Sequence, residues 1–281
     1  MHITINHETV YTYEEPVSYS IQSLRLTPQP YDGQIVRSWS IEAPKAGMLH
    51  AFSDSFGNVT HTLVIDKPHE EVRIRVKGEV HTQDTKGFVK GTTDPFPASF
   101  YLRETDQTKP DGAIRAIARA AQSNGEGVLD ILHALMGTIR DAIDYQTGET
   151  HAMTTAIEAL TNGAGVCQDH AHVFIAAARA IDIPARYVSG YLLHSADGEE
   201  SEASHAWAEA LVPDLGWVAF DVANSVCTTD HYVRVGVGLD YQEASPVRGV
   251  RRGGGDEKLD VSVLVSQTPG STVNSTGGAQ Q

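Results

Sequence analysis

Residues 163–181 read Gly-Ala-Gly-Val-Cys-Gln-Asp-His-Ala-His-Val-Phe-Ile-Ala-Ala-Ala-Arg-Ala-Ile, and this stretch indicates how the second half of the chain folds. Its two glycines supply a sharp turn, because glycine adopts backbone angles that other residues avoid. The alanine-rich apolar run after them predicts a buried helix that begins at or near Cys167. From Pro184 onward the apolar residues recur with a period of two, which is typical of strands.

Helical and strand patterns are segregated on the two sides of this stretch. Upstream, residues 128–143 carry apolar side chains at the i, i+3, i+4 and i+7 spacing of a helix with one core-facing stripe. Downstream, turn residues separate three strand candidates, at 186–192, 206–212 and 217–222. Because helices cluster first and strands follow, the pattern predicts an α+β fold rather than alternating βαβ units.

The first 82 residues contain strand patterns only. Residues 3–13 and 72–76 alternate apolar and polar side chains, and prolines and glycines punctuate the runs between them. No helix of ordinary length fits this region. We therefore expect an N-terminal antiparallel β-sandwich-like domain.

The chain divides into four predicted segments. The N-terminal β domain spans residues 1–82, and a glycine- and proline-containing linker spans residues 83–111. The core of helices packed on an antiparallel sheet spans residues 112–267, in which residues 259–265 form one further strand that returns to the sheet or to the N-terminal domain. Residues 268–281 lack aromatic side chains, and we expect them to be disordered.

Composition excludes several classes of protein. The chain has 281 residues, room for about two domains, and its 21 Lys and Arg against 36 Asp and Glu give a net charge of −15. This charge argues against nucleic acids and anionic membranes as partners, since both attract positive proteins. The N-terminus lacks a signal-peptide pattern, no apolar run reaches the roughly 18 residues of a membrane span, and the cysteines are few. The sequence therefore predicts a cytoplasmic protein.

Cys167, His205 and Asp221 are the candidate catalytic residues. A lone cysteine is more often a small buried hydrophobe, but a thiol in the first turn of a helix lies where the helix dipole favours the thiolate. A nucleophilic thiol also requires a base, and the base requires an orienting acceptor. His205 and Asp221 lie in successive strand candidates, which can place imidazole and carboxylate side by side.

The other chemically interesting residues favour structural roles. Cys227 has no comparable setting, so we expect it to pack. Cys167, Asp169, His170 and His172 resemble a metal-ligand cluster in composition, but at about 100° per residue of helix they cannot all face one ion. Neither a metal site nor an organic cofactor is expected, and no calcium-binding loop pattern is present.

Four motifs, in order along the chain, resemble those of the bacterial transglutaminase-like superfamily of cysteine peptidases. The motifs are Gly165–His172, Ala185–Tyr191, Ser204–Glu209 and Gly216–Asp221. The segments His7–Tyr13 and Asp54–Asn58 resemble the β-region that precedes this core in bacterial members. Asp230–Tyr241 and Pro246–Gly249 resemble the family's C-terminal part, so the resemblance covers nearly the whole chain.

The resemblance implies a papain-like transglutaminase core and acyl transfer at amide bonds. Cys167 would be the nucleophile, His205 the general base that later protonates the leaving amine, and Asp221 the residue that orients the imidazole. Water as acceptor would make a peptidase or amidase, and an amine would make a transglutaminase. The Cys167 N–H would be one oxyanion donor, while Tyr145 or a backbone amide are candidates for the second.

Two alternatives stay open at the level of sequence. One is an acyltransferase of the arylamine N-acetyltransferase type, which would require a coenzyme A site. The other is a non-catalytic peptide-binding scaffold of the same fold. The substrate is a peptide, a protein or a small amide in the catalytic interpretation, and the sequence does not indicate the oligomeric state.

Overall fold

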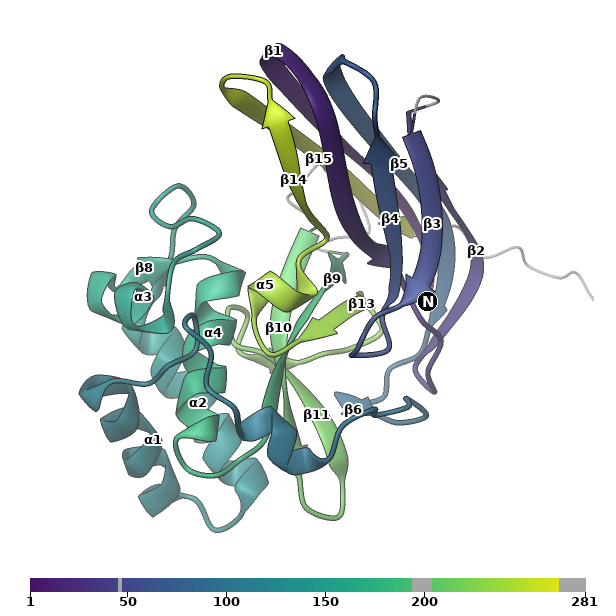
Figure 1. Ribbon diagram of the computed structural model, residues 1–281. Coiled ribbons are helices and arrows are strands. Elements are labelled where there is room, and N and C mark those ends of the chain that lie inside the picture. The colour runs from purple at the N-terminus through teal and green to yellow at the C-terminus, as the bar shows by residue number, and fades with distance from the viewer. Residues whose placement is uncertain (45–46, 194–203, 268–281) are drawn as a thin grey trace, which may run out of the picture.

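The computed structural model describes residues 1–44, 47–193 and 204–267 (Figure 1). The tail predicted to be disordered, residues 268–281, lies outside the described residues. Seven antiparallel strands form the first sheet, in the order β2-β5-β1-β4-β3 with β14 and β15 also paired to β1. These strands are β1 (His2–Thr27), β2 (Gln34–Glu42), β3 (Gly47–Ser53), β4 (Val59–Ile65), β5 (His69–Thr82), β14 (Val247–Gly253) and β15 (Glu257–Gln267).

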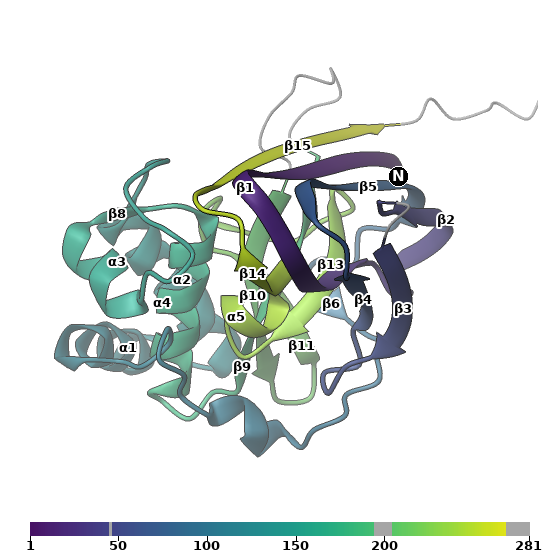
Figure 2. The same ribbon diagram turned by 45° about the horizontal axis from the view of Figure 1, so that its top comes forward.

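The long strand β1 bends and divides this sheet into two halves (Figure 2). Its first half pairs with β5 and β15, and its second half pairs with β4 and β14. The ladder to β5 is interrupted between the pairs Thr12–Glu71 and Val17–His69, next to Pro16, which cannot donate a ladder hydrogen bond. The two halves enclose an apolar core made by Tyr13, Val17, Leu24, Leu26, Leu63, Ile65, Val72, Ile74 and Val76.

A second antiparallel sheet forms the centre of the molecule. Its strand order is β12-β11-β10-β9-β13, and the short β6 pairs with β11. The strands are β6 (Phe88–Val89), β9 (Ala185–Leu192), β10 (Ser204–Val212), β11 (Gly216–Asp221), β12 (Val226–Cys227) and β13 (Tyr232–Gly238). A two-stranded parallel pair, β7 (Asp144–Tyr145) and β8 (Ala164–Gly165), lies beside the helices.

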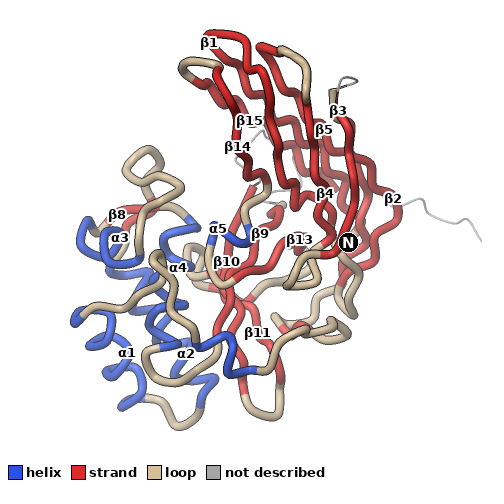
Figure 3. The backbone as a smooth tube through the Cα atoms, in the orientation of Figure 1, coloured by secondary structure: helices blue, strands red, loops and turns tan. Residues whose placement is uncertain are grey.

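The helices gather on one side of the second sheet (Figure 3). They are α1 (Gly112–Asn124), α2 (Val128–Ala142), α3 (Ala156–Asn162), α4 (Cys167–Arg179) and the single turn α5 (Tyr241–Ala244). A 3₁₀ turn at Ala98–Leu102 packs through Tyr101 against Trp217 of β11. Helix α4 is buried almost all round, and it packs on β10 through the small side chains of Ala206, Ala208 and Ala210. No helix in the described part of the chain has the length and apolarity that crossing a membrane requires.

This arrangement confirms the α+β class predicted from the sequence. Asn58 provides one of the links between the two sheets, because its side chain donates to the Val237 carbonyl at 2.7 Å and accepts from the Val237 N–H at 2.9 Å. The segment 83–111 contributes β6 and the 3₁₀ turn to the core. β15, which includes the candidate strand 259–265, pairs with β1 of the first sheet. Strand alternation alone does not indicate which sheet a strand joins.

Candidate active site

Cys167 is the first residue of α4, as the sequence predicts, and its side chain is only partly buried. The two glycines before Cys167 have different structural roles. Gly163 ends α3 with a left-handed φ of 64°, a backbone conformation that glycine adopts without strain. Gly165 lies in close contact with the helix start, because a Cβ there would lie 2.7 Å from the Cβ of Asp169. Gly163 therefore makes the turn, and Gly165 makes room for α4.

Asp169 holds the first turn of α4. Its Oδ2 atom accepts hydrogen bonds from the Val166 N–H at 2.8 Å and from the Thr150 hydroxyl at 2.7 Å. The carboxyl group is buried, and this burial raises its pKa above the ordinary value despite the two bonds. Asp169 thus links the loop before α3 to the residue that precedes Cys167.

His205 and Asp221 lie on the neighbouring strands β10 and β11, and the structure brings their side chains together. The Nε2 atom of His205 is 2.7 Å from Oδ2 of Asp221, and both residues are buried. The strands are in antiparallel register from Ala208–Phe220 to Val212–Gly216. The pairing of two consecutive strands therefore places the imidazole and the carboxylate side by side.

Asp221 has two further partners that the sequence analysis did not identify. Tyr232, on β13, donates its hydroxyl to Oδ2 at 2.7 Å. Asn224, in the turn after β11, donates its side-chain amide to Oδ2 at 2.7 Å and its backbone N–H to Oδ1 at 3.2 Å. Burial alone would raise the pKa of Asp221, but the hydrogen bonds from His205, Asn224 and Tyr232 lower it below the usual value. The carboxylate is therefore held ionised.

The side chain of His205 also makes a hydrogen bond with Cys167. Burial alone would lower the pKa of His205, but the bonds to Asp221 and Cys167 raise it to about 10. An imidazolium between a thiolate and a carboxylate is the charge arrangement of an activated cysteine. The structure thus brings all three predicted residues together.

The other polar residues near the start of α4 have separate partners. His170 directs its two ring nitrogens toward the carbonyl oxygens of Val166 and Ile143, at 2.9 and 3.1 Å. His172 accepts a hydrogen bond from the Tyr241 N–H at 3.1 Å, and burial lowers its pKa to about 3. No group of three potential metal ligands occurs among the described residues.

Two other residues that the sequence analysis considered, Tyr145 and Cys227, lie on short strands next to the candidate site. Tyr145 pairs with Gly165 through β7 and β8, its ring stacks against His170 with centroids 6.3 Å apart, and it is exposed. Cys227, on β12, pairs with Phe220 of β11, and burial raises the pKa of the Cys227 thiol. That direction disfavours a thiolate, which is consistent with the packing role expected for Cys227.

The chain matches two family models and a relative of similar length. The models are the bacterial transglutaminase-like N-terminal region, over residues 3–81, and the transglutaminase-like superfamily, over residues 115–222. An uncharacterised protein of Mycobacterium leprae is 32% identical over 275 residues, which cover 93% of this chain and 97% of that protein. The chain belongs to the transglutaminase-like superfamily. Another relative, an uncharacterised protein of Mycobacterium tuberculosis, is 28% identical over 287 residues. This match covers 93% of the present chain and 91% of the relative.

A solved structure shares the fold of this transglutaminase-like chain. It is a Cytophaga hutchinsonii protein described as a candidate cysteine protease, with a TM-score of 0.78 and 21% identity. The match covers 96% of this chain and 92% of that one. The two proteins therefore have the same overall fold.

Proposed function

We propose that this protein catalyses thiol-dependent acyl transfer at amide bonds, with Cys167 as nucleophile, His205 as acid and base, and Asp221 as the residue that orients His205. The observation that carries this proposal is the position of His205, which bonds to Asp221 at 2.7 Å and also to Cys167. Membership of the transglutaminase-like superfamily supports an enzyme of this class.

In the first half of the reaction, the Cys167 thiolate attacks the carbonyl carbon of the amide. The C–N bond of the tetrahedral intermediate then breaks, and the imidazolium of His205 gives its proton to the leaving nitrogen. Ammonia or an amine departs, and the acyl group remains on Cys167 as a thioester. Asp221 stabilises the imidazolium before this transfer, and Asn224 and Tyr232 keep that carboxylate ionised and in place.

In the second half, an acceptor attacks the thioester carbonyl. His205, now neutral, removes the acceptor's proton, and the C–S bond breaks to restore the Cys167 thiolate and the imidazolium. Water as acceptor releases a carboxylic acid, whereas an amine gives a new amide. The proposal includes both acceptors, and the acyl donor is a peptide, a protein or a small amide. The predicted compartment is the cytoplasm.

The oxyanion of the intermediate requires donors close to Cys167. The first N–H groups of a helix have no partner within it, so the Cys167 N–H at the start of α4 is a suitable donor. The positive end of the helix dipole at the same position favours both the thiolate and the oxyanion. Tyr145, on β7 and paired with Gly165 of β8, remains a candidate for the second donor.

The test is the pH dependence of Cys167 alkylation by iodoacetamide, followed by mass spectrometry in the wild type and in His205→Ala. We expect rapid alkylation of Cys167 in the wild type at neutral pH, and much slower alkylation in the variant. Cys227 provides an internal reference, because burial raises the pKa of its thiol. An ordinary thiol at Cys167 that does not respond to the loss of His205 would contradict the proposal.

A further inference from the structure

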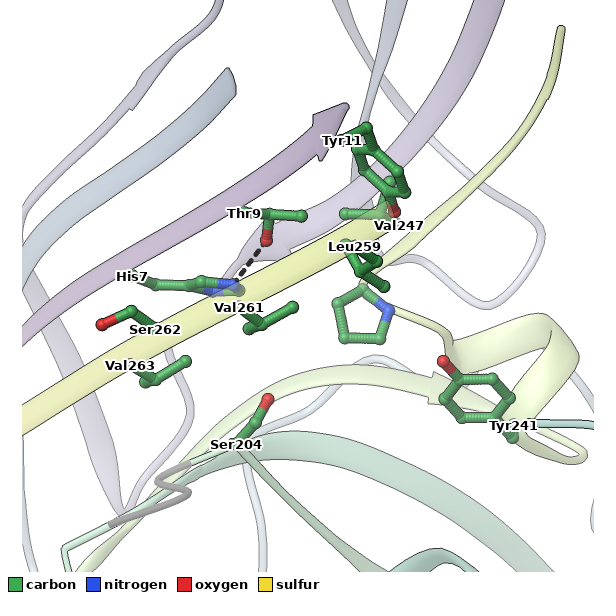
Figure 4. Close-up of a pocket in the computed structure, with 11 residues that line it drawn as sticks. His7, Thr9, Tyr11, Ser204, Tyr241, Val247, Leu259, Val261, Ser262 and Val263 are labelled. Carbon is green, nitrogen blue, oxygen red and sulfur yellow. Dashed lines mark hydrogen bonds between the residues drawn. The ribbon is translucent and has the colours of Figure 1, made fainter. Parts of the chain in front are cut away.

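A cavity of about 620 Å³ lies between the β1–β15 ladder of the first sheet and the core (Figure 4). One wall is the face of the β1–β15 ladder, where three directly opposed residue pairs line the cavity. These pairs are His7–Val263, Thr9–Val261 and Tyr11–Leu259. Because side chains alternate along a strand, the odd-numbered residues of both strands share this face.

The opposite side of the cavity belongs to the core. Ser204, the residue before His205, and Tyr241, in α5, face β15 across the cavity (Figure 4). The Tyr241 N–H donates to His172 on α4, and its ring packs against Tyr187 with centroids 6.2 Å apart. Burial, and after it the charge interaction with Cys167, raise the pKa of Tyr187. Two lining residues thus neighbour the candidate site, since Ser204 precedes His205 on β10 and Tyr241 contacts residues of α4 and β9.

The lining of this cavity carries no formal charge, and most of its side chains are apolar or aromatic. None of the described lining residues is Asp, Glu, Lys or Arg, and burial lowers the pKa of His7 to about 4, so that its ring is neutral near pH 7. Leu259 and Val261 are 51% and 53% exposed. Exposed apolar side chains that line a concave surface are typical of a ligand-binding site.

We propose that this cavity receives an apolar side chain of a peptide acyl donor, close to the amide that Cys167 attacks. The inference rests on the proposed function, since it assigns a substrate subsite to the same reaction. Three observations carry it: the volume, which suits one large side chain and its flanking backbone; the uncharged lining; and the contact with the strand that holds His205. The first sheet then acts as one wall of the substrate site, and the preferred donors are peptides with a leucine-like or aromatic residue near the reactive amide.

The probes for this test are four N-acetyl dipeptidyl chloromethyl ketones, with Leu or Ser at either position and Gly at the other. The Cys167 thiolate displaces chloride and forms a thioether, which mass spectrometry counts. We expect Leu to react about tenfold or more faster than Ser at one of the two positions, because burying such a side chain is strongly favourable. Iodoacetamide, which has no side chain to place, measures Cys167 reactivity independently.

Val261→Trp fills the cavity, and we expect it to reduce the Leu-to-Ser rate ratio to below about threefold. Met48→Trp on β3 is the matched control, because Met48 is also 53% exposed in the same sheet but does not line the cavity. This control should keep the wild-type ratio. Val261→Thr keeps the branched shape of the strand residue and should lower the ratio by a smaller factor, even if Val261→Trp folds poorly.

The two proposals fail in different ways. A Cys167 that reacts rapidly with iodoacetamide, in a His205-dependent manner, but shows equal rates for Leu and Ser probes overturns the assignment of the cavity and leaves the proposed function standing. The same holds if folded Val261 variants keep the full Leu preference. A Cys167 that reacts slowly with iodoacetamide and independently of His205 overturns both proposals.

Discussion

The Tyr232 hydroxyl lies 2.7 Å from Oδ2 of Asp221, the same oxygen that faces His205 Nε2 at 2.7 Å. One carboxylate oxygen thus serves a residue of β10 and a residue of β13, with β11 supplying the carboxylate itself. Asn224 adds a third bond to this oxygen at 2.7 Å. The ring of His205 is therefore positioned by a small network of buried bonds rather than by a single contact, and this network is the basis of the first two predictions.

Asp221→Asn should abolish the imidazolium character of His205. With the carboxylate gone, only the interaction with Cys167 still opposes burial, and the pKa of His205 should fall well below its value of about 10. We expect acyl transfer to decrease by about 10²–10⁴-fold, and the Cys167 alkylation profile to shift toward higher pH. Asp230→Asn is the control, because Asp230 and His231 form a comparable pair at 3.4 Å on the surface; a similar loss there would contradict the assignment.

Tyr232→Phe should have a milder effect. It removes one donor from Asp221 but leaves the bonds from His205 and Asn224, so the pKa of Asp221 should rise while the carboxylate still orients the ring. We expect activity to fall less than in Asp221→Asn, by about tenfold or less, and stability to fall by about 1–3 kcal/mol because the bond to the carboxylate is lost. Kinetics and urea unfolding measure the two effects, and Tyr19→Phe, at an exposed position, should change neither.

The sequence pointed to Cys167, His205 and Asp221 as candidate catalytic residues because each lies in a recognisable local pattern. Cys167 follows a glycine turn and precedes an alanine-rich run, which marks a helix start. His205 and Asp221 lie in alternating runs separated by turn residues, so neighbouring strands were expected. Asn224 and Tyr232 carry no such signal, because one lies in a turn and the other on β13, and only three-dimensional folding brings them to Asp221.

The cavity beside the site was also beyond sequence analysis, for a similar reason. The alternation of residues 259–265 predicts a strand, but the pairing of β15 with β1 depends on contacts between segments about 250 residues apart. The bend of β1 then turns one face of that ladder toward the core. Register and curvature of a sheet arise from nonlocal packing, which local periodicity does not encode.

Gly165→Ala should disturb the start of α4. The new Cβ would lie 2.7 Å from the Cβ and Oδ2 atoms of Asp169, so the cap at Val166 must move. We expect a loss of about 1–3 kcal/mol in the free energy of unfolding and slower alkylation of Cys167. Gly137→Ala is the control, because the Cβ that alanine adds there, in α2, meets no heavy atom within 4 Å. It should stabilise the helix by about 0.5–1 kcal/mol, and equal effects of the two changes would contradict the argument.

His172 should make the protein sensitive to acid. In the folded state burial lowers the pKa of His172 to about 3, whereas in the unfolded chain the group takes up a proton near pH 6.5. The unfolded state therefore binds more protons between these values, and the stability from this group falls by about 1.4 kcal/mol per pH unit as the pH drops through that window. His172→Gln, which keeps an acceptor for the Tyr241 N–H, should flatten the slope of unfolding free energy against pH.

His7 adds to the same acid sensitivity, since burial lowers its pKa to about 4, so a slope should remain in the His172→Gln variant. His50→Gln, at an exposed position on β3, serves as the control and should leave the wild-type slope unchanged. Urea unfolding at several pH values between 4 and 7 measures the effect. An identical slope in the wild type and in His172→Gln would show that His172 does not stay neutral in the folded protein.

Glu209, on the strand that carries His205, lies between two arginines and is completely buried. Its carboxylate accepts from Arg186 at 2.6 Å and from Arg234 at 2.7 Å. Burial alone would raise the pKa of Glu209, but the two guanidinium groups lower it to about 2. Glu209→Gln removes the negative charge, so that Arg234 faces a neutral amide and Arg186 keeps only its ion pair with Asp94 at 3.2 Å. We expect a loss of about 3–5 kcal/mol in unfolding free energy, because removing one partner of a buried ion pair leaves the opposite charge uncompensated.

Glu8 provides a matched comparison, because it also lies between two arginines, Arg73 and Arg75, but at the surface of the first sheet. Solvent screens that cluster, so Glu8→Gln should leave the urea midpoint almost unchanged. The same measurement on both variants therefore separates burial from charge pairing. If Glu8→Gln destabilised the protein as much as Glu209→Gln, the pairing itself would be responsible. If Glu209→Gln had little effect, water must reach Arg186 and Arg234, and the strand carrying His205 would not depend on this cluster for its position.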